Sequence, residues 1–190
     1  MEFLEIIQTI GAVIKIVETV IQVLAPVIQK IGQALGLVEE DEKCEDLGAR
    51  ALNAEEAGVL PENFASFDEY LEEIKKFPPE TSRPMEERLS KGAELIMGAI
   101  TEKYPGFDPE VFSALVNLPE LTTENWCAEL GNLLKSGELN PASLSDYLLN
   151  RPMADNDRYS AIDSLVGIEK KNNPKMSDSE AMDKISKVRN

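Results

Sequence analysis

The feature that most constrains this chain is a stretch near its start, residues 3–37, in which apolar side chains recur with the period of an α-helix. With Ile7 as position a of a seven-residue repeat, all fifteen a, d and g positions over five repeats are apolar. A stripe of this width is typical of a helix that packs against other helices. We therefore predict one long amphipathic helix whose interface is formed by its a and d residues, in particular Ile7, Ile10, Ile14, Val17, Ile21, Leu24, Ile28, Ile31 and Leu35.

Three details refine this prediction. Pro26 removes a backbone donor and should kink the helix. Ile16 and Val23, at position c, widen the apolar surface beyond half the circumference, which favours burial on two sides. A helix of this length, roughly 50 Å at about 1.5 Å per residue, cannot be covered by any single short helix downstream. Self-association or a groove on a partner would cover it.

Capping patterns divide the remainder of the chain into short helices. No run of residues alternates between apolar and polar with a period of two, which argues against a sheet. We predict an all-α fold: a long N-terminal amphipathic helix plus a compact bundle of short helices. The domain organisation expected is 1–38 for the long helix, 39–168 for an acidic helical domain, and 169–190 for a polar linker with a short C-terminal helix. The predicted helices are 43–57, 67–77, 84–104, 111–118, one capped by Thr122 and closed by Gly137, one from Asn140, one near 157–167 and one from Ser177.

Charge argues against nucleic acid as a partner, since the net charge is −16. Residues 39–90 carry sixteen acidic against six basic side chains. The simplest interpretation is a solvated face, and the alternative is a surface that blocks a basic partner. Residues 170–190 hold six basic against three acidic side chains and form a mildly basic tail. Docking on the acidic region of the same chain, docking on a neighbouring molecule and free disorder all stay open for this tail.

The chain lacks the residues on which most enzymes depend. It has no histidine, which removes catalytic and metal sites built on imidazole, and it has neither a phosphate-binding glycine loop nor a nucleophile elbow. The run from Asp155 begins like a calcium loop, but Ser160 and Val166 stand where glycine and glutamate are required. Cys44 and Cys127 are expected to be reduced packing residues. We predict no catalytic, cofactor-binding or metal-binding residues.

The expected function is that of a non-enzymatic structural, assembly or interaction protein. It would dock on a protein partner, or oligomerise with itself, through residues 3–37, as a component of a larger particle or machine. A membrane-active protein, whose N-terminal helix inserts in or lies on a bilayer, ranks second, because the polar face of that helix has almost no Lys or Arg and aromatic belts are lacking. No uncharged run approaches the 18 or so residues of a spanning helix, which disfavours an ordinary transmembrane helix. An acidic inhibitor of a basic partner ranks third. The start of the chain lacks a basic region before its apolar stretch, so cytoplasmic synthesis without a classical signal peptide is expected.

Overall fold

The computed structural model describes residues 3–117 and 123–187, and these ranges contain helices and connections but no strand. The all-α prediction, a long N-terminal helical segment packed on a bundle of helices, is confirmed. The helices are α1 (Phe3–Val17), the 3-10 turn η1 (Glu18–Val20), α2 (Ile21–Ala34), α3 (Cys44–Glu56), the 3-10 turn η2 (Pro61–Asn63), α4 (Phe67–Ile74), α5 (Met85–Lys103), α6 (Val111–Val116), α7 (Glu124–Ser136), α8 (Pro141–Leu148), α9 (Asp155–Asn172) and α10 (Asp178–Ser186).

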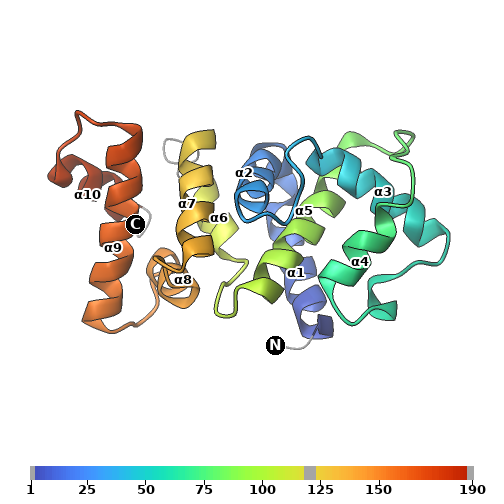
Figure 1. Ribbon diagram of the computed structural model, residues 1–190, viewed down its shortest axis with the longest axis horizontal. Helices are drawn as coiled ribbons and strands as arrows, with labels where there is room; N and C mark the ends of the chain where they lie inside the picture. The colour runs from blue at the N-terminus through green and yellow to red at the C-terminus, as the bar shows by residue number, and fades with distance from the viewer. Residues whose placement is uncertain (1–2, 118–122, 188–190) are drawn as a thin grey trace.

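The helices form a row along the long axis of the molecule (Figure 1). In spatial order α10 packs on α9, α9 on α7, α7 on α2, α2 on α5 and α5 on α3. The remaining helices fill the flanks, with α1 and α4 against α5, α6 against α2 and α8 against α9. The acidic helices α3 and α4 therefore lie at one end of the row, and α10 lies at the other.

The N-terminal segment is not one continuous helix. The 3-10 turn at Glu18–Val20 divides it, and α1 and α2 run in different directions on either side (Figure 1). Pro26 lies inside α2, whereas the break between the two helices comes earlier, at this turn. A run of β-branched side chains restricts side-chain rotation in a helix and weakens it locally. Five of the six residues before Gln22 are of this kind: Ile16, Val17, Thr19, Val20 and Ile21.

The segment ends earlier than position 37. The helix stops at Ala34, and Gly36 adopts a left-handed backbone with φ of +72°. The Leu37 N–H donates to the Gly32 carbonyl oxygen over 2.9 Å, which closes the helix in the manner of a glycine cap. The prediction that Gly36 terminates this helix is therefore confirmed.

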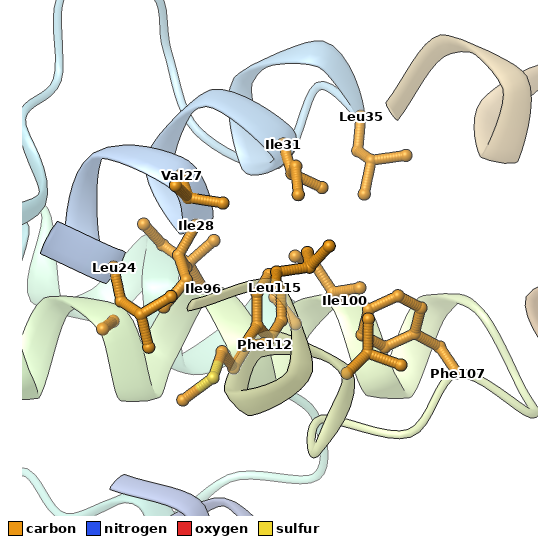
Figure 2. Close-up of a cluster of buried hydrophobic side chains, with 14 of the residues drawn as sticks. Leu24, Val27, Ile28, Ile31, Leu35, Ile96, Ile100, Phe107, Phe112 and Leu115 are labelled. Carbon is orange, nitrogen blue, oxygen red and sulfur yellow. The ribbon is translucent and has the colours of Figure 1, made fainter. Parts of the chain in front are cut away.

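The apolar stripe of α2 lies in the core, as Figure 2 shows. The side chains from α2 face Ile96 and Ile100 of α5 and Phe112 and Leu115 of α6, with Phe107 closing one side. No single helix covers the stripe. Both α1 and α2 pack against α5 and α6, and α2 also packs against α7. Several short helices of the same chain together form the surface that covers the stripe, although no one of them is large enough to do so. The α2 residues in this cluster are Leu24, Val27, Ile28, Ile31 and Leu35.

The pair α3 and α5 is packed most closely, with backbone against backbone. A Cβ atom added to Gly48 would overlap the Arg88 carbonyl group, and one added to Gly92 would overlap the Cys44 carbonyl group. The two glycines therefore let α3 and α5 approach more closely than they could if either position carried a side chain. Cys44 begins α3 at this crossing, and its N–H donates to Gln29 Oε1 of α2 over 2.9 Å. This contact ties α2, α3 and α5 together.

Most of the other predicted boundaries agree with the structure. Ser66 caps α4, Asn140 caps α8, and Ser177 forms a capping box with Glu180 at α10. The helix closed by Gly137 is capped by Thr123 rather than by Thr122, which lies outside the described residues, as does position 118 at the end of the helix predicted over 111–118. The largest difference is α9, which continues to Asn172 through the predicted linker. Its last turn carries Glu169, buried beneath α10.

Candidate functional site

The outer face of the bend between α1 and α2 carries the candidate site. Ile16 is 66% exposed and Val23 is 59% exposed, so the chain itself does not cover position c, and the predicted burial of this second side requires a partner. Met85, the first residue of α5, is 48% exposed. It adjoins Glu86, whose Oε1 accepts a hydrogen bond from Gln22 Nε2 over 3.0 Å. We call the residues Ile16, Glu18, Val23, Met85 and Glu86 the elbow surface.

A groove of about 380 Å³ shares Glu18 and Glu86 with the elbow surface. It lies where the bend, α3 and the first half of α5 meet, since Glu18 belongs to η1, Leu52 to α3 and Glu94 to α5. Glutamates dominate the charged part of its lining. The residues that line it are Glu18, Leu52, Pro84, Glu86, Glu87, Ser90, Lys91 and Glu94.

The cations near the groove are bound by the chain's own carboxylates. Lys91 Nζ lies 2.6 Å from Glu55 Oε1 and 3.2 Å from Glu94 Oε1, and its side chain is only 13% exposed. Burial lowers the pKa of Lys91, but the charges of Glu94 and then Glu55 outweigh burial and raise its pKa above the ordinary value. Arg83 pairs with Glu87 over 3.0 Å and also with Glu56. The groove therefore presents a negative surface to a visiting molecule.

The predicted interface residues lie mostly inside the chain. Ile10, Val17 and Ile21, together with the α2 members and Leu35, are buried in the core, while Ile7 and Ile14 are partly buried against it. The stripe of a and d residues thus contacts the chain's own helices in this conformation. What the N-terminal segment leaves exposed is its c flank, at Ile16 and Val23, together with Leu4 near its start.

A second cavity of about 470 Å³ opens where the start of α1 meets the connection between α5 and α6. Its charged side chains are engaged in holding the fold. Arg151 Nη2 lies 2.6 Å from Asp108 Oδ2 and 3.3 Å from Glu110 Oε2. Glu102 Oε2 accepts from the Phe67 N–H at the start of α4 over 3.0 Å, and burial raises the pKa of this carboxyl. These contacts give both groups a structural role.

Both cysteines are buried free thiols, on α3 and α7. Burial raises the pKa of Cys44 and of Cys127 to about 12. A thiol with such a pKa is protonated at neutral pH and is a poor nucleophile. The interpretation of both as packing residues agrees with this environment.

Among the described residues, no group of three or more potential metal ligands gathers. One helical segment, Phe3–Ala34, is long and apolar enough to cross a membrane, with a mean hydropathy of 1.8 in an 18-residue window. Buried residues make up 39% of that window. A core helix of a soluble protein and an N-terminal signal sequence satisfy the same criteria. The segment carries a few charged residues, so its longest uncharged run is shorter than its apolar length.

The sequence pattern identifies two of the five residues of the elbow surface. Ile16 and Val23 stood out because they add to an already wide apolar stripe. The glutamates of α5 were not singled out, although Glu87, Lys91 and Glu94 share one face of a helix by their spacing of four and three residues. Their spacing shows that they lie together, but only the fold shows that this face borders the bend.

Comparison of the chain with protein-family models, with curated proteins and with solved structures gives no match, so the functional argument depends on the residues described above.

Proposed function

We propose that this protein is a non-enzymatic interaction protein, which binds another protein through the outer face of its N-terminal helical segment. The observation that carries the proposal is the exposure of Ile16 and Val23 on a segment whose other large apolar side chains are mostly in the core. Exposed apolar side chains that gather on one face, rimmed by polar groups, are typical of protein interaction sites. The carboxylates nearby support a binding role over a catalytic one, because most are paired with lysine, arginine or glutamine.

A different protein is favoured over a second copy as the partner. The net charge of −16 makes two copies repel each other at low and moderate salt. The N-terminal segment, residues 1–38, carries two basic against three acidic side chains and is the least charged part of the chain. A partner that lacks the overall acidic excess avoids the repulsion between two copies, and assembly into a larger particle through this segment is consistent with the proposal.

Membrane binding is the second candidate, and the apolar character of Phe3–Ala34 favours it. Insertion of this segment would require Ile28 and Ile31 to leave the core, where both are fully buried. It would also bring an acidic protein to a surface that in many membranes is anionic. These two costs place protein binding ahead of lipid binding.

Site-directed photo-crosslinking tests the proposal. A benzophenone side chain at position 16 or 23 should yield protein adducts in cells that make the protein, and the same group at Tyr159 or Met182 should not. These two control positions are exposed apolar side chains of α9 and α10, which lie at the end of the row away from α3 and α5. Adducts at all four positions, or at none, would overturn the proposal. Flotation with neutral lipid vesicles that is lost in an Ile16→Ser/Val23→Ser variant would favour the membrane candidate instead.

A further inference from the structure

We infer that the cavity at the start of α1 binds a small organic cation, a primary amine with an apolar body, whose ammonium group pairs with the Glu102 carboxylate. This cavity is separate from the elbow surface. Phe3 and Thr9 line it from the first half of α1, whereas Ile16 lies near the other end of that helix. The inference therefore goes beyond the proposed function and can be tested independently of it.

The cavity has the size and the mixed lining of a small-molecule site. Its volume is about 470 Å³, within the roughly 300–1,000 Å³ that is usual for such sites. The lining comes from α1, the last turn of α5, the connection between α5 and α6 and the residue Arg151 after α8, so distant parts of the chain converge on it. A ligand with an apolar body suits the apolar part of this lining, which consists of Phe3, Ile6, Pro105, Phe107 and Pro109.

Glu102 supplies the cavity with a carboxylate that no cation of the described chain neutralises. Burial is the largest influence and raises the pKa of Glu102, and the charges of Asp68 and Glu69 raise this pKa further. The N–H groups of Phe67 and Asp68 donate to the carboxylate and oppose the rise in pKa, with 3.0 Å between the Phe67 nitrogen and Oε2. An ammonium group beside the carboxylate would offset both the burial and the repulsion.

The hydroxyl groups in the lining favour the same kind of ligand. Thr101 Oγ1 donates its proton to the Met97 carbonyl oxygen over 2.9 Å, and Thr9 Oγ1 donates to the Glu5 carbonyl oxygen over 2.9 Å. With their protons engaged in this way, both hydroxyl oxygens can only accept hydrogen bonds from a ligand. An ammonium group offers three donors, whereas a carboxylate or phosphate offers acceptors alone.

Arg151 does not reverse this preference, although it lines the cavity. Its Nη2 lies 2.6 Å from Asp108 Oδ2 and 3.3 Å from Glu110 Oε2, so one guanidinium group faces two carboxylates. The positive charge of Arg151 is therefore offset by its own partners. An anionic ligand would compete with these carboxylates for Arg151, and it would also be repelled by Glu102.

Titration of the full chain with 2-phenylethylamine, which is protonated at pH 7, tests the inference without a change to the protein. We expect a Kd of about 0.1–1 mM by isothermal titration calorimetry, as suits so small a ligand. Two compounds with the same apolar body, 2-phenylethanol and 3-phenylpropanoate, should each bind about tenfold more weakly or worse. Equal affinity for all three would show a merely apolar site, and no binding at about 10 mM amine would show no site. Either result would overturn the inference.

Nuclear magnetic resonance during the same titration locates the amine. The amide signals of Phe67 and Phe107 should shift, because the Phe67 N–H donates to Glu102 and Phe107 lines the cavity. Glu102→Gln removes the charge but keeps an oxygen that can accept from the Phe67 N–H, and we expect about tenfold weaker binding. Asp157→Asn makes the same charge change at an exposed position of α9 and should leave the Kd within about twofold.

A second variant tests the position of the site if Glu102→Gln fails to fold, which circular dichroism reveals. Ala65 is exposed and lines the cavity, so Ala65→Leu narrows it with little effect on the core and should weaken binding of the amine. Unaltered affinity in either folded variant, or amide shifts confined to residues outside the cavity, would overturn the inference. These results leave the proposed function unaffected, because crosslinking at Ile16 and Val23 reports on a different surface.

Discussion

Two helix pairs at opposite ends of the row are held together in different ways. The α3 and α5 pair meets through its backbones at Gly48 and Gly92, with small side chains around the crossing. The α9 and α10 pair buries only Ala181 and Ile185 from α10 and adds ion pairs, among them Lys184 with the buried Glu169. The first contact depends on shape and the second largely on charge.

This difference predicts where the molecule is rigid. Close packing of backbones forms part of the cooperative core, whereas a terminal helix with two buried side chains opens at low free energy. The elbow surface belongs to the rigid end, because Met85 and Glu86 are the first two residues of α5, the helix that crosses α3. A binding surface held there needs little rearrangement when a partner arrives, which reduces the entropy lost on binding.

The largest expected effect comes from filling the glycine contact. In Gly48→Ala the new methyl group would overlap the Arg88 carbonyl, so α3 and α5 must separate. We expect a loss of about 3 kcal/mol in the free energy of unfolding. Urea titration followed by the fluorescence of Trp126, the single tryptophan, measures it. Gly11→Ala is the control, since a Cβ there meets nothing within 4 Å. A Gly48→Ala protein as stable as that control would contradict the proposed contact.

The second effect tests the charge network beside the same crossing. In Lys91→Met the carboxylates of Glu55 and Glu94 lose their common cation, and we expect a cost of about 1.5–3 kcal/mol at pH 7. Because the folded state raises the pKa of Lys91, its stabilising contribution is complete below the unfolded pKa, near 10.4, and is lost as pH rises through the folded value.

Urea titrations between pH 7 and pH 11.5 measure this dependence. The gap in unfolding free energy between the unaltered protein and Lys91→Met should be constant to about pH 10 and should narrow above it. Lys103→Met, which removes an exposed lysine from the same helix, should show a small gap at every pH. A gap that widens at high pH would reverse the assigned sign.

Local signals in the sequence were sufficient for helix boundaries but not for helix pairing. Serine, threonine and asparagine caps and Gly137 act within one turn of the chain, so they are readable from a few neighbouring residues. The heptad pattern does not predict the break at Glu18–Val20, because the apolar stripe continues through it, whereas Pro26, the residue expected to disturb the helix, lies inside α2. Which face of α3 meets α5 depends on residues more than forty positions apart, such as Gly48 and Gly92.

The candidate site was also predictable only in part. The excess of apolar residues at Ile16 and Val23 was visible, yet their exposure followed from how the chain covers the main stripe. The main stripe itself was expected to need an external partner. The prediction treated the downstream helices singly, whereas α5, α6 and α7 cover the stripe jointly once the segment bends.

The third effect concerns the α9 and α10 pair, which depends largely on ion pairs. Lys184→Met leaves the Glu169 carboxylate, only 2% exposed, without its nearby cation. We expect α10 to lose about 1–2 kcal/mol of local stability, less than a fully buried pair would, because Lys184 is partly exposed. Amide hydrogen exchange over 178–186 should accelerate about fivefold to thirtyfold, while exchange in α5 is unchanged. Equal acceleration in both helices would show that α10 unfolds only with the whole molecule.

The smallest effect sharpens the comparison within α9 itself. Gly167 lies in the middle of this helix, and a Cβ atom there would meet nothing within 4 Å. Because alanine favours a helix over glycine, Gly167→Ala should stabilise α9 by about 0.5–1 kcal/mol. The substitution is chemically the same as Gly48→Ala, but the expected change in stability has the opposite sign, because there is room for a Cβ atom at Gly167 and none at Gly48. Slower amide exchange across 160–172 measures the gain, and faster exchange would mean that Gly167 has a close neighbour.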